Sequence, residues 1–193
     1  ATTPSTIIKT RAAFIREDGA IVDLDGTSAV NFNLFSPTVA DGSYHLVIRH
    51  RNHLPIRSAN PLTLSAGILS VYDFSTAQTK AYQNSTITTN FAQVALPVGV
   101  FGMWAGNANG MTTGTNAANQ VKASAPNPSN DYFYLFNTTL SGNLLTILSN
   151  VYHPSDLNMD GQVKMTAPNN TNDFFFLFNT VLSGNVTIIL NQH

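Results

Sequence analysis

The sequence predicts a mainly β protein: a β-sandwich followed by a small duplicated C-terminal module in which each copy is a loop, a short helix and a strand. Three observations lead to this prediction. Short β-branched and aromatic runs separated by turn residues fill the first hundred residues, no convincing amphipathic helical pattern precedes residue 100, and one segment of the C-terminal third occurs twice. We therefore place the β-sandwich at residues 1–105 and the duplicated module at residues 106–193, packed on the sandwich.

Regularly spaced short strands are expected in the first hundred residues. Asp-Gly pairs at 18–19, 25–26 and 41–42 separate them, and an Asn-Pro pair at 60–61 marks a further turn. Short strands repeated between such turns are typical of a β-sandwich. The predicted strands are residues 6–16, 20–24, 29–35, 43–50, 62–64, 69–74, 86–89 and 91–96.

The C-terminal third contains a tandem duplication. Residues 120–148 and 162–190 are identical at 19 of 29 positions and lie 42 residues apart. Such repeats usually form small units that bury their apolar faces against each other. With the preceding loops, the two copies span about 114–148 and 156–190. The polar stretch 106–119 leads into them as a linker or, alternatively, as an ordered loop.

Each copy is expected to contain a short helix. An asparagine at 130 and 172 can cap it, the aspartate that follows lies where the helix dipole favours a carboxylate, and a Ser-Gly pair ends it. The aromatic runs at 131–136 and 173–178 leave a second interpretation open, because such runs also suit strands. A strand is predicted after each helix, at 144–148 and 186–190. The apolar face of the second helix comprises Phe174, Leu177, Phe178, Val181 and Leu182.

An acidic loop precedes the second copy. Residues 156–162 read Asp-Leu-Asn-Met-Asp-Gly-Gln, so alternating side chains and one carbonyl can face a common centre. Calcium prefers six to eight oxygen ligands, which predicts one Ca²⁺ site here. Position twelve of a standard loop is Ala167, which has no ligand oxygen, so the last ligand must come from beyond an insertion. The alternative is an Asx-turn loop that binds no ion. The predicted ligands are Asp156, Asn158, Asp160, Gln162 and Asp173.

The first copy carries a weaker version of this loop. Its aligned positions, Gly114, Asn116 and Ala118, contain no carboxylate. Two asparagines further upstream can substitute for them if the loop is longer. Neutral amide ligands bind calcium weakly. The weaker candidate ligands are Asn107, Asn109, Asn116 and Asp131.

Three motifs resemble modules in exported surface proteins of gliding-type Gram-negative bacteria. They are YHLVIRHRNHL at 44–54, MWAGNANG at 103–110 and DLNMDGQVK at 156–164. These modules are often labelled haemagglutinin-like and end in dockerin-like calcium loops. The resemblance covers roughly residues 16–173, and it implies export across the outer membrane and a calcium-braced β fold without an established activity. The first loop departs from the pattern because it lacks acidic residues.

The composition bears on partners and location. Charged residues are 10% of the chain, against about 25% in an average soluble domain, and the net charge is −1. Identical copies can therefore associate at little electrostatic cost. Nine Lys and Arg against ten Asp and Glu argue against nucleic acid, and no apolar run is long enough for membrane insertion. The chain has no cysteine, which is ordinary in an exported bacterial protein. The Ala-Thr-Thr-Pro start resembles the end left by signal-peptide removal, so we expect an extracellular or cell-surface location.

A basic cluster is the main candidate for ligand binding, because it can hold a carboxylate, a sulfate or a sugar acid. Its members are Arg49, His50, Arg51, His53 and Arg57. The alternative is that its arginines pair across a sheet with the acidic residues Glu17, Asp18, Asp23 and Asp25 and that its histidines cap a strand end. A metal pair formed by the two histidines lacks a third ligand nearby in the sequence.

Catalysis is not expected, because the chain has no Gly-x-Ser-x-Gly elbow, no His-Glu-x-x-His motif, no P-loop and no thiol. We predict a non-enzymatic extracellular structural protein, a subunit of a surface filament that joins other copies of itself by exchange of a terminal arm and is braced by calcium. The alternative is a calcium-dependent carbohydrate-binding adhesin whose partners are glycans or other surface proteins. The candidate arm residues are Thr6, Ile7, Ile8, Ile188 and Ile189. The alternative is that these ends pair with a sheet of their own chain.

Overall fold

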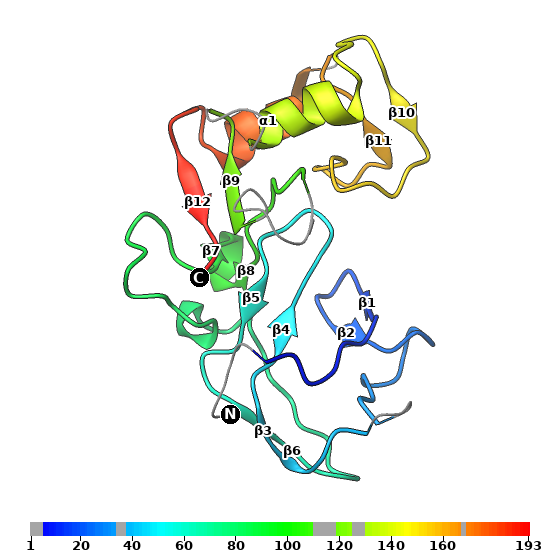
Figure 1. The fold of residues 1–193 in the computed structure, drawn as a ribbon, viewed down its shortest axis with the longest axis vertical. Helices are drawn as coiled ribbons and strands as arrows, with labels where there is room; N and C mark the ends of the chain where they lie inside the picture. Colours follow the sequence, from blue (N-terminus) through cyan, green and yellow to red (C-terminus); the bar gives the residue numbers. More distant parts are fainter. Residues whose placement is uncertain (1–5, 34–37, 110–118, 125–129, 167–168) are drawn as a thin grey trace. The chain divides into compact units, whose positions relative to one another are not determined.

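A computed structural model describes residues 6–33, 38–109, 119–124, 130–166 and 169–193. This part of the chain is mainly β, as predicted, and its strands pair into antiparallel sheets of two strands each (Figure 1). The chain forms two compact units. We call residues 1–46 and 60–72 the N-terminal unit, and residues 47–59 and 73–193 the C-terminal unit. Residues 47–59 and 73–105 thus belong with the repeats, whereas the sequence analysis placed them with the sandwich.

The N-terminal unit contains two small sheets and few buried apolar side chains. Gly19 lies in the turn between the first two strands with a φ of 83°, a left-handed conformation that favours glycine. The buried apolar residues are Val22, Val39 and Leu62. Strand β1 (Phe14–Ile15) pairs with β2 (Ile21–Val22), and β3 (Gly42–Tyr44) pairs with β6 (Leu62–Leu64).

A buried carboxylate fastens this unit internally. Asp23 is 7% exposed and accepts two hydrogen bonds from the Arg11 guanidinium, at 2.6 and 2.8 Å. Its oxygens also accept the backbone N–H groups of Leu24 and Asn31. The hydrogen bonds from Asn31, Leu24 and Arg11 lower the pKa of Asp23 below its ordinary value. Its charge is therefore fully compensated inside the unit.

The C-terminal unit begins with two hairpins, and the first of them contributes to a small apolar cluster. The cluster consists of Ile56, Ala81 and Ala92, with Ile48, Phe74 and Met103 against it. Strand β4 (Val47–Ile48) pairs with β5 (Ile56–Arg57), and β7 (Val94–Ala95) pairs with β8 (Phe101–Gly102). Two short 3-10 turns lie in the same region, η1 (Gln78–Lys80) and η2 (Pro97–Gly99).

The duplicated segment forms the larger core of this unit. Its buried residues come in pairs from the two copies, Val121 with Val163, Leu135 with Leu177, and Leu140 with Leu182. The elements of the first copy are β9 (Gln120–Lys122), α1 (Asp131–Phe133), η4 (Tyr134–Thr139) and β10 (Leu148–Ser149). Those of the second are β11 (Gln162–Val163), η5 (Asn169–Thr171), α2 (Asp173–Phe175), η6 (Phe176–Val181) and β12 (Ile189–Asn191).

The two copies exchange strands with each other. Strand β9 of the first copy pairs with β12 of the second, and β10 of the first pairs with β11 of the second (Figure 1). The registers match: Val121 faces Leu190 in one sheet, and Val163 faces Leu148 in the other. The module is therefore a pseudo-twofold pair in which neither copy completes a sheet alone.

The predicted helices are confirmed, and the interpretation of the aromatic runs as strands is wrong. The Asn130 and Asn172 side chains accept the N–H groups of Phe133 and Phe175, each at 2.7 Å, and so cap the two helices. Gly142 and Gly184 have φ values of 71° and 73°, as expected of left-handed ends.

Each helix continues as a π-helix after its first turn, which was not predicted. The N–H of Leu140 donates to the carbonyl of Leu135, five residues earlier, and Leu182 donates in the same way to Leu177. This spacing brings the two leucines of each copy to the same face, and all four are buried. The aromatic side chains Phe174 and Phe178 are only half-buried and stack on each other.

The strand predictions were partly right. Residues 62–64 form β6 as predicted, whereas 69–74 and 86–89 form no strand, and neither does the described part of 29–35. Strands β5, β8, β9 and β11 were missed. In the repeats, strands begin later than at 144 and 186, because Asn143 and Asn185 accept the N–H groups of Leu145 and Thr187 and extend the turn. The strands form separate two-stranded sheets, so the β-sandwich remains a prediction.

Candidate functional site

A buried aspartate clamps the loop of each copy against its strand. In the first copy, Asp131 is fully buried; its Oδ1 accepts the N–H of Ala108 at 2.8 Å and its Oδ2 accepts that of Lys122 at 2.9 Å. Burial raises the pKa of Asp131 to about 7, although the hydrogen bonds from the backbone oppose this shift. This carboxylate, predicted as a weak calcium ligand, holds the backbone.

The second copy repeats the clamp with Asp173. Its Oδ1 accepts the N–H of Leu157 at 2.6 Å, and its Oδ2 accepts that of Lys164 at 2.9 Å. Burial again raises the pKa to about 7. Both oxygens of this predicted calcium ligand are thus engaged by backbone donors.

The clamps show which loop residues correspond. Ala108 and Leu157 each donate to the clamping carboxylate of their copy, although the loop from there to the strand is longer in the first copy. The corresponding pairs are therefore Asn107 with Asp156, Ala108 with Leu157, and Asn109 with Asn158. This supports the longer-loop alternative for the first copy. The other aligned positions, among them the candidate ligand Asn116, lie outside the described residues.

Asp156 is the most unusual residue of the second loop. It is fully buried, and its Oδ2 accepts hydrogen bonds from Arg51 at 3.1 Å and from the N–H of Gly161 at 3.2 Å. Its Oδ1 is also buried and accepts no hydrogen bond from the described part of the chain. Burial raises the pKa of this carboxyl above its ordinary value, against the effect of Gly161 and Arg51. A buried oxygen with an available lone pair fits a cation ligand.

The other predicted ligands form a network around the Lys164 ammonium. Asp160 Oδ2 accepts Lys164 Nζ at 3.0 Å, and Gln162 Oε1 accepts it at 2.7 Å. Asn158 Oδ1 accepts the N–H of Asp160 at 3.1 Å, and its Nδ2 donates to the carbonyl of Thr171. The described residues contain no group of three or more His, Asp or Glu side chains arranged to hold a metal. A calcium ion here would replace the lysine contacts and use Asp156 Oδ1.

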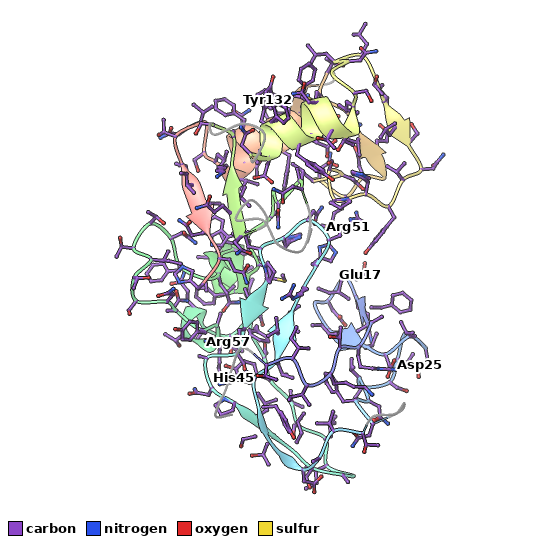
Figure 2. The ribbon with its side chains drawn as sticks, viewed as in Figure 1. Glu17, Asp25, His45, Arg51, Arg57 and Tyr132 are labelled. Atoms are coloured by element: carbon purple, nitrogen blue, oxygen red, sulfur yellow. The ribbon has the colours of Figure 1, made fainter. Side chains whose placement is uncertain are left out.

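The basic cluster does not converge on one site. Arg51, labelled in Figure 2, lies in the turn of the β4–β5 hairpin. Its guanidinium lies over the Tyr152 ring at 4.0 Å and pairs with Asp156. Arg57, on β5, lies over the Tyr82 ring at 3.9 Å, and Arg49 is exposed. The acidic residues of the alternative have other partners: Asp18 pairs with Arg16 and Asp23 with Arg11.

Asn52 was not predicted, and it connects the loops of both copies. Its Nδ2 donates to the carbonyl of Asp156 at 2.6 Å, while its own carbonyl accepts the N–H groups of Gly106 and Asn107, each at 3.1 Å. It is fully buried. The sequence offered one signal for this role, an asparagine within the polar run RHRNHL, because asparagine side chains in turns often bond to backbone groups.

The two candidate arms differ. Ile189 belongs to β12 and pairs with Lys122, and Ile188 packs on the module's core. Beyond them, His193 accepts the N–H of Asn84 at 2.9 Å, so this end is docked in its own chain. At the other end Thr6, Ile7 and Ile8 are exposed, the two isoleucines by 72% and 55%.

Comparisons with known proteins gave no match to a protein-family model, a curated protein or a solved structure. The site is therefore interpreted from its own geometry. Within the described ranges no helix is both long and apolar enough to span a membrane.

Proposed function

We propose that the chain is a non-enzymatic structural protein of the cell exterior, a self-assembling subunit whose N-terminal arm joins one copy to the next. The observation that carries this proposal is the contrast between the arms. The C-terminal strand is paired within its own chain, whereas Ile7 and Ile8 present two large apolar side chains to solvent. An extended β-branched arm of this kind can add to an open sheet edge of another copy.

The sheets of the N-terminal unit favour the same role. In β1 and β2, Phe14, Ile15 and Ile21 are exposed by 53%, 56% and 36%. Phe14 and Ile15 are adjacent in one strand, so both faces of this hairpin are uncovered. Two-stranded sheets are marginal alone and gain stability when strands or a covering layer are added. In this proposal the β-sandwich forms when a neighbouring copy supplies that addition.

Calcium is proposed to brace the second loop of the C-terminal unit. Asp156 Oδ1 supplies a buried oxygen, and Asp160 and Asn158 lie in the same loop. The bound ion would compensate the buried carboxylate, a task that Arg51 shares in this structure.

Electron microscopy of the native protein tests the proposal, first in calcium and then after chelation. Filaments are expected in calcium and fewer or shorter filaments without it. The paired substitutions Ile7→Asp and Ile8→Asp should abolish assembly while the circular dichroism spectrum stays unchanged. Leu145→Asp is the matched control, because Leu145 is 80% exposed but lies in the C-terminal unit. Dispersed monomers in every condition would rule out self-assembly.

A pocket in the C-terminal unit favours the second candidate function, carbohydrate binding. It has a volume of about 270 Å³ and is lined by six neutral polar side chains, Ile87 and Phe91, which is 60% exposed. An exposed aromatic ring beside amide and hydroxyl groups suits a sugar ring. Loss of glycan-array binding in Phe91→Ala, with Arg49→Ala unchanged, would favour this function and this pocket over the basic cluster.

A further inference from the structure

Three polar atoms converge in the turn of the β4–β5 hairpin. His53 donates its backbone N–H to the carbonyl of His50 at 3.4 Å, so the two histidines occupy the ends of one turn. Their Nδ1 atoms lie 2.9 Å apart. The Oδ1 atom of Asn52 lies 3.0 Å from the first and 2.7 Å from the second. Two imidazole nitrogens and one amide oxygen thus form a small triangle.

Hydrogen bonds and a metal ion are alternative ways to use this triangle. A neutral imidazole carries one N–H, and an amide oxygen accepts through two lone pairs. If both Nδ1 atoms are protonated, both can donate to that oxygen, and if one is protonated, it can donate to the oxygen or to the other nitrogen. If both rings carry their proton on Nε2 instead, three lone pairs face one centre. A cation at the centre would accept all three lone pairs at once.

The spacing of the three atoms fits a transition-metal ion. Metal–nitrogen bonds of about 2.0–2.1 Å at right angles place neighbouring donors about 2.9 Å apart. The observed separations are 2.7, 2.9 and 3.0 Å, which match one face of an octahedron and are shorter than the about 3.3 Å that the same bonds give in a tetrahedral shell. The two rings meet edge to face at 69°, so their planes can both contain a common centre. Calcium bonds of about 2.3–2.6 Å and its preference for oxygen make it the poorer fit.

The three donors are held on a rigid frame. The Nδ2 atom of Asn52 donates to the carbonyl of Asp156, which directs Oδ1 toward the histidines. The next residue along, Leu54, is buried and donates its N–H to the carbonyl of Trp104 at 2.8 Å. His53 itself bridges to Ala105. Such preorganisation reduces the cost of assembling a metal site.

The nearest basic side chain in the sequence is that of Arg51, and its positive charge acts on both histidines. Its guanidinium is paired with Asp156 and lies over the Tyr152 ring, so part of that charge is compensated. The histidine pair is visible in the sequence, but its third donor was missed because it is an asparagine rather than a third histidine or a carboxylate.

We propose that His50, Asn52 and His53 bind one divalent first-row transition-metal ion, through two Nδ1 atoms and one amide oxygen, with water completing the shell. Imidazole nitrogen suits zinc, nickel and copper ions. The chain would then carry two chemically distinct cation sites, one for a transition metal in the hairpin turn and one for calcium in the acidic loop. This site depends on neither proposed function.

Calorimetric titration of the full chain with Zn²⁺, in saturating Ca²⁺, tests the proposal. One Zn²⁺ per chain is expected, and His50→Ala and His53→Ala should each weaken it by at least about tenfold, the loss typical of metal-site changes. His45→Ala and His153→Ala are the matched controls and should leave binding unchanged. Affinity that survives both ligand substitutions, or that falls in either control, would overturn the proposal.

Nitrogen NMR of the unsubstituted protein provides a second test that does not depend on folding of the variants. Zn²⁺ should shift the Nδ1 resonances of His50 and His53 and leave their Nε2 atoms protonated. Shifts at the Nε2 atoms instead, or at neither ring, would contradict the proposed coordination.

Discussion

The two copies of the repeat share one clamp but differ in the loop that it holds. Asp131 and Asp173 occupy the same position at a helix start, and each accepts backbone N–H groups from a loop and a strand. The loops contain Asn107 in the first copy and Asp156 in the second. The same clamp therefore holds a neutral loop in one copy and an acidic loop in the other, so the clamp itself does not require the acidic residues. This comparison supports cation binding as the role of the charge at Asp156.

The largest expected loss of stability comes from substitutions in the shared core. Leu135→Ala and Leu177→Ala each remove a fully buried side chain at equivalent positions and should lower the free energy of unfolding by about 2–5 kcal/mol. Urea denaturation followed by circular dichroism measures this. The two losses should be similar, because the copies are structurally equivalent. Leu145→Ala, at an exposed site, should change stability little; a large loss there would contradict the assigned core.

The next largest loss of stability is expected when the clamping aspartate is removed. Asp131→Ala and Asp173→Ala each leave buried backbone N–H groups without an acceptor, at about 1–3 kcal/mol for each orphaned group. The same urea titration should show similar losses in the two copies. Asp18→Ala, which removes an exposed carboxylate, is the control. A loss confined to the second copy would mean that only the acidic loop needs its clamp.

The clamps also predict a pH dependence. The pKa values of Asp131 and Asp173 are raised to about 7 in the folded chain, from 3.8. The folded state therefore binds more protons than the unfolded state between these values, so its stability should fall as pH rises from about 4 to about 7. Denaturation across this range in a calcium chelator measures the slope. Asp131→Asn should roughly halve it, because Asp173 still titrates; an unchanged slope would assign the titration to other groups.

The smallest expected effect on stability converts the second loop into the first. Asp156→Asn keeps the clamp and the side-chain shape but removes the charge, so the chain should fold with a loss of about 1 kcal/mol, typical of a point change. Calcium binding, measured by calorimetry, should nevertheless be lost. The reverse change, Asn107→Asp, should strengthen calcium binding at the first loop. Undiminished calcium binding by Asp156→Asn would place the ion elsewhere.

Local signals predicted the features that depend on neighbouring residues. The caps at Asn130 and Asn172, the left-handed glycines and strand β6 all follow from short-range chemistry, and all are confirmed. The π-helical extensions were missed, because an apolar pattern at three- and four-residue spacing also accommodates leucines five apart. Their fit depends on the opposite copy, which the sequence does not place.

The site was predicted less completely than the fold. The acidic loop was visible as a spacing of residues, but the partner of Asp156 is Arg51, which lies 105 residues away in the chain. The role of Asn52 was not predicted, because it depends on contacts with two loops that are distant in the sequence. Residue spacing indicates which nearby side chains can bind one ion together. It does not indicate which distant turn contacts them in the folded chain.

The exchange of strands between the copies also determines when the chain can fold. Within the described part of the chain, strand β9 pairs only with β12, so the sheet that contains residues 120–122 can form only after residue 191 has been synthesised. Contacts between such distant segments form slowly. During synthesis the module therefore cannot close this sheet until its last strand has been made.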